Sequence, residues 1–246
     1  MADRTSQPAT GVGANSIYSS VRFIWNGVAP NTNQNTGASG TGSKGTSVAA
    51  VPGTYQLFSN TDGAIVFSSI TVPTGAYTLV LVAAYPAANK TAAGRIFSTP
   101  GGGVRNEGTT TVTAVNQSIV HTNIGGAAGV TKADGFDDDI WTFVVRYDGT
   151  TITQDLRAPG GTTTSASGAL GYLVGSAATI ELGSSAGSVC MGGLYAVLYT
   201  AADVGSTEAT AIMDYPWRIF APEAGGSAVP RPGPIRSFAS VRASRY

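Results

Sequence analysis

The stretch Asp139-Ile140-Trp141-Thr142-Phe143-Val144-Val145-Arg146-Tyr147-Asp148-Gly149, followed by Thr151-Ile152-Thr153-Gln154, decides the fold class of this chain. Side chains alternate between the two faces of a strand. One face of the first strand is expected to hold Trp141, Phe143 and Val145, and the other Thr142, Val144 and Arg146. An Asp-Gly pair between two such runs favours a tight turn. The sequence therefore predicts an antiparallel hairpin with strands at 140–147 and 151–154.

Similar short patterns extend outward from this hairpin in both directions. Strands are expected at 17–25, 55–58, 64–70, 78–84, 94–98, 109–115, 118–122, 179–182 and 194–199. The run at 78–84 is continuously apolar, which predicts a strand buried on both faces. The turn signal Asn60-Thr61-Asp62-Gly63 predicts a hairpin, and Gly192-Gly193 predicts a bulge or bend. Short strands separated by turn signals indicate a sandwich or a barrel.

Near the C-terminus the sequence predicts one helix. Ser206 is expected to cap it, Glu208 lies in its first turn, and residues 209–213 continue it. Tyr215 precedes Pro216, and a residue before proline is biased away from helical geometry. The helix is therefore expected to stop there, and Trp217, Ile219 and Phe220 to fold back onto the sandwich.

Three regions are expected along the chain. Residues 1–54 hold an N-terminal arm (1–16), the first strand and a low-complexity loop at 29–50. Residues 55–223 form the sandwich, and residues 224–246 form a basic arm. Four arginines and no acidic residue lie in 226–246.

Composition excludes several classes of protein. Only 11% of the residues are charged and the formal net charge is +0, whereas a general nucleic-acid binder carries a basic excess. Cys190 is the single cysteine, so no intrachain disulfide and no cysteine-based zinc site can form. The N-terminus lacks the pattern of a signal peptide, and no apolar run is long enough to span a membrane. The chain is expected to be made in the cytoplasm, without binding nucleic acid or inserting into a membrane.

Several motifs together resemble a known family of folds. Asp139 to Gly149 resembles the hairpin of laminin-G-like and concanavalin A-like jelly rolls, and Ile180-Glu181-Leu182-Gly183 resembles their Ile-x-Leu-Gly strand. The run from Gly193 to Tyr199 is similar to their Gly-x-Ile-x-x-Val-x-Tyr strand. The resemblance implies an all-β, antiparallel jelly-roll β-sandwich of the concanavalin A-like type, with one short C-terminal helix and extended terminal arms.

The ending of the domain is the most specific part of the resemblance. Tyr215-Pro216-Trp217-Arg218-Ile219-Phe220-Ala221-Pro222 resembles the Asn-Pro-Trp-Gln-Ile-Phe-Ala-Pro ending of phage-encoded members of this family. Membership of that group would imply a virion structural protein of a tailed phage. One departure stands after the hairpin, where the family's Tyr-x-Asp-Gly is replaced by Gln154-Asp155-Leu156-Arg157. This departure puts in doubt a ligand role for that turn.

The sequence argues against catalysis. His121 is the single histidine and lies at the end of a plain strand, so it is interpreted as structural rather than as part of a nucleophilic relay. Jelly-roll glycosidases use paired carboxylates, and the four glutamates at 107, 181, 208 and 223 form no such pair. Cys190 is interpreted as a small buried hydrophobic residue. The chain is therefore expected not to be an enzyme, and no cofactor is expected.

Two binding sites are candidates. Calcium prefers several carboxylate oxygens on a flexible loop, as Asp134, Asp137, Asp138 and Asp139 would offer, although a solvated turn explains the same cluster. Aromatic rings stack on sugars, and the candidates are Tyr85, Tyr147 and Tyr172, although strand aromatics more often lie in the core.

The terminal arms suggest partners. The C-terminal arm offers Phe238, Val241 and Tyr246 as apolar anchors and Arg236, Arg242 and Arg245 as partners for acidic surface. These features favour docking onto other virion proteins and onto copies of the same chain. The main expectation is a non-enzymatic virion component, tail-associated or capsid-decorating, that acts in assembly and surface presentation. The alternative is a carbohydrate-binding, lectin-like module that recognises host surface polysaccharide.

Overall fold

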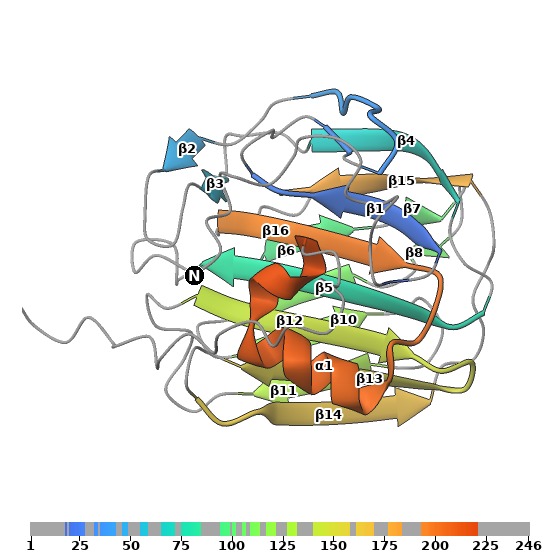
Figure 1. Ribbon diagram of the computed structural model, residues 1–246, viewed down its shortest axis with the longest axis vertical. Coiled ribbons are helices and arrows are strands. Elements are labelled where there is room, and N and C mark those ends of the chain that lie inside the picture. Colours follow the sequence, from blue (N-terminus) through green and yellow to red (C-terminus); the bar gives the residue numbers. More distant parts are fainter. Residues whose placement is uncertain are drawn as a thin grey trace, which may run out of the picture.

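The computed structural model is an antiparallel β-sandwich with one short helix, as predicted (Figure 1). Among the described residues, the strands form a large sheet of eight, a small sheet of six, and a ribbon of β7 (Pro100–Gly101) and β8 (Arg105–Asn106). The structure describes residues 18, 20–27, 32–33, 35–42, 46–48, 55–58, 65–71, 75–84, 94–98, 100–101, 105–106, 109–113, 117–121, 127–131, 140–157, 161–169, 177–183 and 193–220.

The large sheet is built around the predicted hairpin. Its strands are, in order, β14 (Thr164–Ala169), β13 (Thr151–Arg157), β12 (Ile140–Tyr147), β5 (Tyr77–Ala84), β16 (Gly193–Thr200), β3 (Tyr55–Leu57) and β2 (Thr46–Val48), with β1 (Val21–Trp25) also paired to β16. The turn between β12 and β13 contains Gly149, whose φ of 106° favours glycine. Because β1 and β2 belong to this sheet, the sandwich includes residues that precede the expected boundary at 54.

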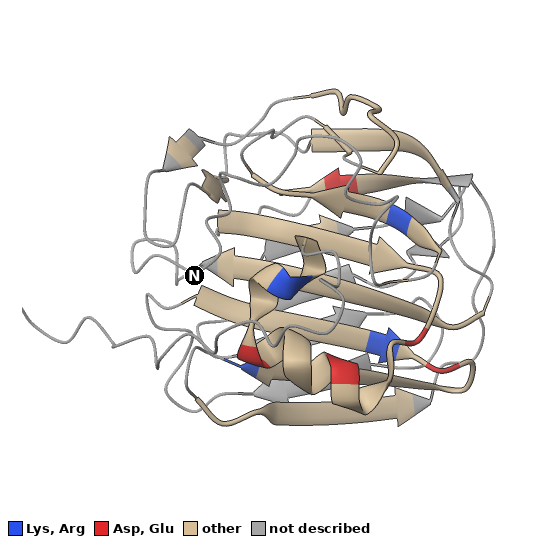
Figure 2. Cartoon of the chain, viewed as in Figure 1, with Lys and Arg blue, Asp and Glu red and all other residues tan. Residues whose placement is uncertain are grey.

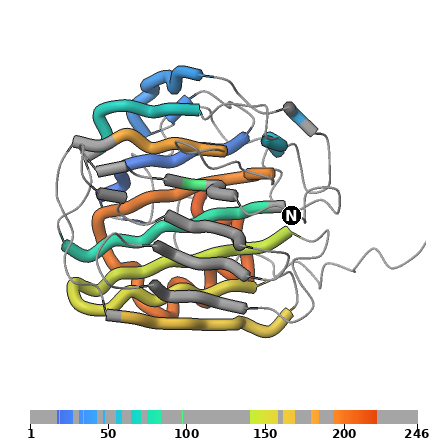
Figure 3. Tube along the Cα trace, turned by 180° about the vertical axis from the view of Figure 1, so that it is seen from behind, coloured from blue at the N-terminus to red at the C-terminus, as the bar shows by residue number. Residues whose placement is uncertain are grey.

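The small sheet covers one face of the large one. Its strands are, in order, β11 (Ala127–Thr131), β10 (Gln117–His121), β9 (Thr109–Thr113), β6 (Gly94–Ser98), β15 (Ala177–Leu182) and β4 (Ile65–Thr71). Seen from behind, the paired strands β4 and β15 lie at the upper edge of the sandwich (Figure 3). The hairpin predicted around residues 60–63 is therefore wrong, because β3 lies in the large sheet and β4 in the small one.

A continuous apolar core fills the space between the sheets. From β12 it takes Trp141, Phe143 and Val145, as predicted, and from β5 it takes the alternate residues Leu79, Leu81 and Ala83. Phe67 of β4 and Ile180 of β15 meet them from the small sheet. Val80, Val82 and Val144 belong to a separate cluster on the other face. This division confirms that β5 is buried on both faces.

The outer face of the large sheet is covered in part by two helical segments, α1 (Gly205–Asp214) and η4 (Pro216–Phe220) (Figure 1). Trp217, Ile219 and Phe220 are buried there against the sheet, which confirms the predicted return of this segment. The helix ends before Pro216, also as predicted. Within the described part of the chain, no helix is long and apolar enough to cross a membrane.

Two bulges change which side chains face the core. In β16 the register shifts between Leu194 and Ala196, so Leu194 faces the inner core whereas Tyr195 and Ala196 both face the outer cluster. The shift lies just after the predicted bend at Gly192-Gly193. In β1 a shift between Val21 and Phe23 directs Val21 to the outer cluster. Val21 therefore does not share a face with Phe23 and Trp25, contrary to simple alternation.

Gly183, at the end of the Ile180-Glu181-Leu182-Gly183 motif, is required by its backbone and its neighbours. Its φ is 104°, and a Cβ atom there would lie 2.3 Å from the ring of Phe58. Residues other than glycine rarely adopt this backbone conformation, and the Phe58 ring leaves no space for a Cβ atom. Backbone geometry and core packing therefore explain the glycine of this motif.

Two local expectations require correction. Ser206 does not cap α1: Val204 occupies the N-cap without a side-chain hydrogen bond, and Ser206 lies inside the helix. The segment 29–50 is not simply a loop, since it contains β2 and a turn in which Asn33 is buried. The carboxamide oxygen of Asn33 accepts the N–H of Ile24 at 3.3 Å and that of Asn35 at 3.1 Å. These hydrogen bonds from backbone N–H groups to the Asn33 side chain join the turn to β1.

Candidate functional site: a polar strip beside the helix

Polar side chains lie on the outer face of β12, β13 and β14, next to α1. In β13, Ile152 and Leu156 face the inner core. By alternation, Thr153 and Asp155 face outward. Residues directly opposite in an antiparallel pair share a face. The registers pair Arg146 with Thr153, Thr153 with Ser167, and Asp155 with Ser165. We call this group the polar strip: Arg146, Thr153, Asp155, Ser165 and Ser167.

A chain of contacts orders the strip. The hydroxyl of Ser165 donates to Oδ1 of Asp155 at 2.5 Å, and Nη2 of Arg146 donates to Oδ2 of the same carboxylate at 3.4 Å. Nη1 of Arg146 lies 3.6 Å from Oδ1 of Asp203. The side chains of Arg146 and Asp155 are only 15% and 11% exposed, whereas Ser165 and Ser167 are exposed. The strip therefore has two ordered charged groups at its base and the exposed residues Ser165 and Ser167 at its surface.

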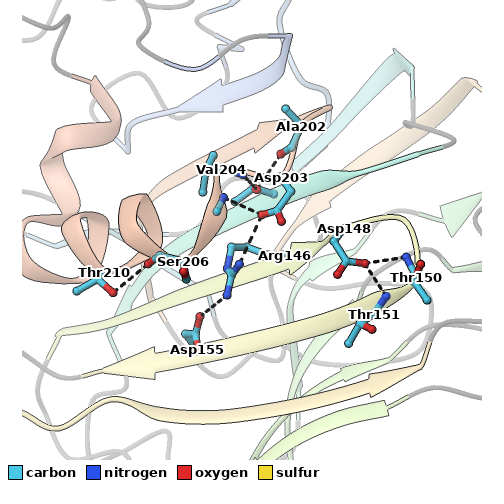
Figure 4. A network of polar contacts seen from close by, with 12 residues as sticks. Arg146, Asp148, Thr150, Thr151, Asp155, Ala202, Asp203, Val204, Ser206 and Thr210 are labelled. Carbon is cyan, nitrogen blue, oxygen red and sulfur yellow. Dashed lines mark hydrogen bonds and ion pairs between the residues drawn. The ribbon is translucent and has the colours of Figure 1, made fainter.

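The loop between β16 and α1 closes one end of the strip (Figure 4). Oδ1 of Asp203 accepts the N–H of Gly205 at 2.9 Å, so the carboxylate that meets Arg146 also holds the first turn of the helix. Thr78 of β5 donates to the carbonyl of Ala202 at 2.8 Å and accepts the N–H of Val204 at 3.1 Å. These bonds attach the loop to the sheet. The arrangement offers a rigid surface of hydroxyl, carboxylate and guanidinium groups.

The β12–β13 turn next to the strip is organised by its own side chains (Figure 4). Oδ1 of Asp148 accepts the backbone N–H groups of Thr150 and Thr151, both at 2.8 Å. These two hydrogen bonds, from Thr151 first, hold the pKa of the exposed Asp148 carboxyl below its usual value. Asp148 is thus a turn residue and not part of the strip.

A second charged cluster lies across α1 from the strip. Glu208 accepts Nε of Arg218 at 2.6 Å and Nη2 at 3.0 Å, and it also accepts the hydroxyl of Tyr18 at 2.8 Å. Burial, and then the negative charge of Glu208, raise the pKa of Tyr18 above its ordinary value. Figure 2 shows that many charged residues of the described chain lie on or beside α1. This cluster ties the chain before β1 to the helix and to η4.

The predicted sugar-stacking role of Tyr147 is wrong. Its side chain is 5% exposed and lies in the inner core, where its ring centroid is 5.7 Å from that of Tyr77. The hydroxyl donates to the carbonyl of Gly149 at 2.7 Å. Tyr147 faces inward because it follows the same alternation as Trp141, Phe143 and Val145. The ring therefore stabilises the hairpin and cannot contact a ligand at the surface.

The other predicted site residues lie outside the described residues. They are Tyr85 and Tyr172 of the stacking set, the calcium candidates Asp134, Asp137, Asp138 and Asp139, and the arm residues Arg236, Phe238, Val241, Arg242, Arg245 and Tyr246. His121 ends β10, and Cys190 also lies outside the described part. In the described ranges, no group of three or more His, Cys, Asp or Glu residues is placed to hold a metal ion.

The polar strip was not predicted from sequence. Asp155 belongs to the Gln154-Asp155-Leu156-Arg157 segment, which departs from the family pattern, and β14 consists of Thr164, Ser165 and other small residues without a clear apolar period. The available signal was the alternation in Thr151–Arg157, where Ile152 and Leu156 point inward and Asp155 must then point outward. The contact of Asp155 with Ser165 and the contact of Arg146 with Asp203 both depend on tertiary structure.

Comparison with known proteins supports the fold and leaves the family open. No protein-family model matches the chain, and no curated protein matches it. Among solved structures, the chain is similar to the binding domain of botulinum neurotoxin DC in complex with SialylT, with 8% identity, a TM-score of 0.53, and coverage of 82% of this chain and 52% of that one.

Two further solved structures are similar to different extents. The binding domain of botulinum neurotoxin serotype C1 has 9% identity, a TM-score of 0.53, and coverage of 83% of this chain and 52% of that one. The LG1-3 region of the laminin α2 chain has 11% identity, a TM-score of 0.43, and coverage of 57% and 31%. The chain spans about half the length of the two neurotoxin structures. At these identities, the two neurotoxin similarities concern the fold alone.

Proposed function

We propose that this chain is a non-enzymatic, lectin-like module that binds carbohydrate, with a host surface polysaccharide as its ligand. The observation that carries the proposal is the polar strip, an ordered row of hydroxyl, carboxylate and guanidinium groups on the outer face of β12, β13 and β14. A sugar presents hydroxyl groups that both donate and accept hydrogen bonds. The strip offers partners of both kinds.

The chemistry of each group in the strip fits such a ligand. The hydroxyls of Ser165, Ser167 and Thr153 can donate and accept, and a carboxylate such as Asp155 can accept about four hydrogen bonds in all. Asp155 uses only two of these within the described structure. The Arg146 contact and the Ser165 bond hold the carboxylate in place before a ligand arrives. Such preorganisation lowers the entropic cost of binding.

The shared fold supports the same class of function. The neurotoxin DC binding domain was solved in complex with SialylT, and it is similar to this chain over most of the present sequence. Folds host many functions, so this likeness supports the proposal only together with the strip. Arg146 contacts both Asp155 and Asp203, so these two carboxylates serve as its ion-pair partners.

A binding experiment tests the proposal directly. The full chain is screened against immobilised oligosaccharides and bacterial surface polysaccharides, and hits are measured by calorimetry. The double variant Ser165→Ala, Ser167→Ala removes two strip hydroxyls and is expected to weaken binding about tenfold or more. The matched control is Ser68→Ala, an exposed strand serine on β4 of the other sheet, and it should bind as the wild type does. Failure of the wild type to bind any saccharide would refute the proposal.

A second candidate function is that of a virion structural subunit, tail-associated or capsid-decorating. The observation that favours it is the Tyr215–Pro222 ending, which resembles that of phage-encoded jelly rolls. Burial of Trp217, Ile219 and Phe220 gives this segment a structural role in the fold whatever the function. The two candidates are compatible, because a module on a particle surface can bind the polysaccharide of a host.

The arms provide the test of this second candidate. We propose that residues 1–16 and 224–246 dock onto other virion proteins or onto copies of this chain, through the apolar and arginine side chains named above. Deleting 224–246 should abolish incorporation into particles, or self-association, while leaving the melting temperature of the sandwich unchanged. Equal incorporation of the truncated and full chains would exclude this role for the arm.

A further inference from the structure

We infer that the polar strip selects uncharged sugars and rejects acidic ones such as sialic acid. This inference rests on the proposed carbohydrate-binding function, and it concerns the class of sugar that the same site accepts. The arginines beside α1 are paired with carboxylates of this chain, whereas recognition of an acidic sugar requires an available arginine.

Recognition of a carboxylate is best served by an arginine whose fork is available. A guanidinium binds a carboxylate through two parallel N–H groups, and this geometry gives both strength and specificity. In the strip, Nη2 of Arg146 is directed to Asp155 and Nη1 to Asp203, at 3.4 Å and 3.6 Å. The remaining nitrogen, Nε, is buried. Both Nη groups of Arg146 are therefore already directed to carboxylates of this chain.

The other described arginines beside α1 are also paired. Arg218 makes the two hydrogen bonds to Glu208 given above, and Nη2 of Arg157 contacts Oδ1 of Asp214. Three arginines thus face four paired carboxylates, and Asp148 adds a fifth acidic group at the adjoining turn. This part of the described surface is net acidic. An anionic ligand approaching the strip would meet repulsion from Asp155 and Asp203.

The groups that remain available are those that a neutral sugar uses. Ser165 and Ser167 are exposed, Thr153 is half-buried, and all three can exchange hydrogen bonds with hydroxyl groups. The unused lone pairs of Asp155 accept hydrogen bonds from sugar hydroxyls, and an ionised acceptor makes stronger bonds than a neutral one. The strip therefore combines attraction for hydroxyl donors with exclusion of carboxylates. Specificity commonly needs both elements.

The test compares matched sugars. The full chain is titrated with uncharged oligosaccharides and with the same oligosaccharides carrying one terminal sialic acid. The wild type is expected to bind the uncharged member of a pair at least about tenfold more tightly. Its affinity for neutral sugar should not change with ionic strength, because screening by salt acts on charged ligands.

A charge-neutralising variant sharpens the test. In the double variant Asp155→Asn, Asp203→Asn, amide oxygens can still accept from Ser165 and from the N–H of Gly205, so the fold should be retained, as circular dichroism and melting would verify. The variant removes both negative charges that face Arg146 and should gain about tenfold in affinity for the sialylated sugars while losing affinity for the neutral ones. Asp148→Asn is the control, because it removes an acidic charge at the turn without freeing an arginine.

The outcomes separate the two proposals. Preference of the wild type for the sialylated partner, or no change of preference in the folded double variant, would overturn the inference and leave carbohydrate binding intact. Absence of binding to every saccharide would overturn the carbohydrate-binding function itself, and the selectivity would fall with it.

Discussion

The inner and outer faces of β12 and β13 are made by the same two strands and serve opposite purposes. The inner face presents Phe143, Ile152 and Leu156 to the small sheet, and each is fully buried. The outer face is divided: Val144 packs under α1, while Arg146 and Asp155 stand at the edge of the helix. The comparison shows that α1 and η4 decide which half of the outer face is core and which half is left polar.

The largest effect is expected on the inner face. Phe143→Ala removes a ring that is 0% exposed and lies between the two sheets, where the surrounding strands cannot collapse into the cavity. Such truncations cost about 3–5 kcal/mol, and this one should lie near the top of that range. Denaturant unfolding measures the change. A loss below about 1 kcal/mol would mean that the two sheets are not packed through this residue.

A slightly smaller effect is expected under the helical cover. Trp217→Ala removes a ring that is 5% exposed and lies 5.8 Å from Tyr195, measured between ring centroids. The loss should be about 3 kcal/mol in the free energy of unfolding. A loss under about 1 kcal/mol would show that η4 adds little to the stability of the sandwich. The inner face would then supply most of the stability.

The hydrogen bond between Tyr18 and Glu208 should make part of the stability of the outer face depend on pH. Tyr18→Phe deletes the hydrogen bond to Glu208 and should cost about 1 kcal/mol at neutral pH. The pKa of the folded-state Tyr18 is raised by burial and by Glu208, so its contribution is complete below the pKa of an unfolded tyrosine, about 10. Above that pH the unfolded tyrosine ionises first, and the contribution declines.

The stabilities of the wild type and Tyr18→Phe should therefore converge as the pH rises above about 10. The difference between the two proteins isolates Tyr18 from the other tyrosines. A constant difference from pH 7 to pH 11 would show that Tyr18 is not shielded by α1 and η4.

The smallest effects concern the start of α1. Asp203→Ala removes the acceptor for the N–H of Gly205 and the partner of Arg146, and it should cost about 1 kcal/mol. Ser206→Ala should change stability by less than about 0.5 kcal/mol, because Ser206 lies inside the helix and its side chain does not cap it. A larger loss of melting temperature in Ser206→Ala than in Asp203→Ala would indicate that Ser206 caps the helix.

The sequence predicted the central part of the fold well, for physical reasons that are local. Alternation in 140–147, the continuous apolar run at 78–84 and the Asp148-Gly149 turn each act over a few residues, and all three are confirmed. Burial of Trp217 follows from the cost of exposing large aromatic rings. These features require no knowledge of which strands become neighbours.

The features that were missed depend on tertiary partners. Strand β14 has few apolar side chains, and it is ordered by pairing with β13 rather than by its own pattern. The bulge at Leu194 and Ala196 reverses part of the expected alternation. The polar strip joins Arg146, Asp155 and Ser165 from three strands, and the register between the strands brings them together. Asp203 reaches Arg146 from the loop before α1.

Amide chemical shifts test the central claim most directly, namely that the polar strip on the outer face binds sugar. Isotopically labelled full-length chain is titrated with an uncharged oligosaccharide while its backbone amide signals are followed by NMR. The account predicts saturable shifts at Thr153, Asp155, Ser165 and Ser167, with little change at Ser68 on β4 of the small sheet. Saturable shifts confined to other parts of the chain, with the strip unchanged, would contradict it.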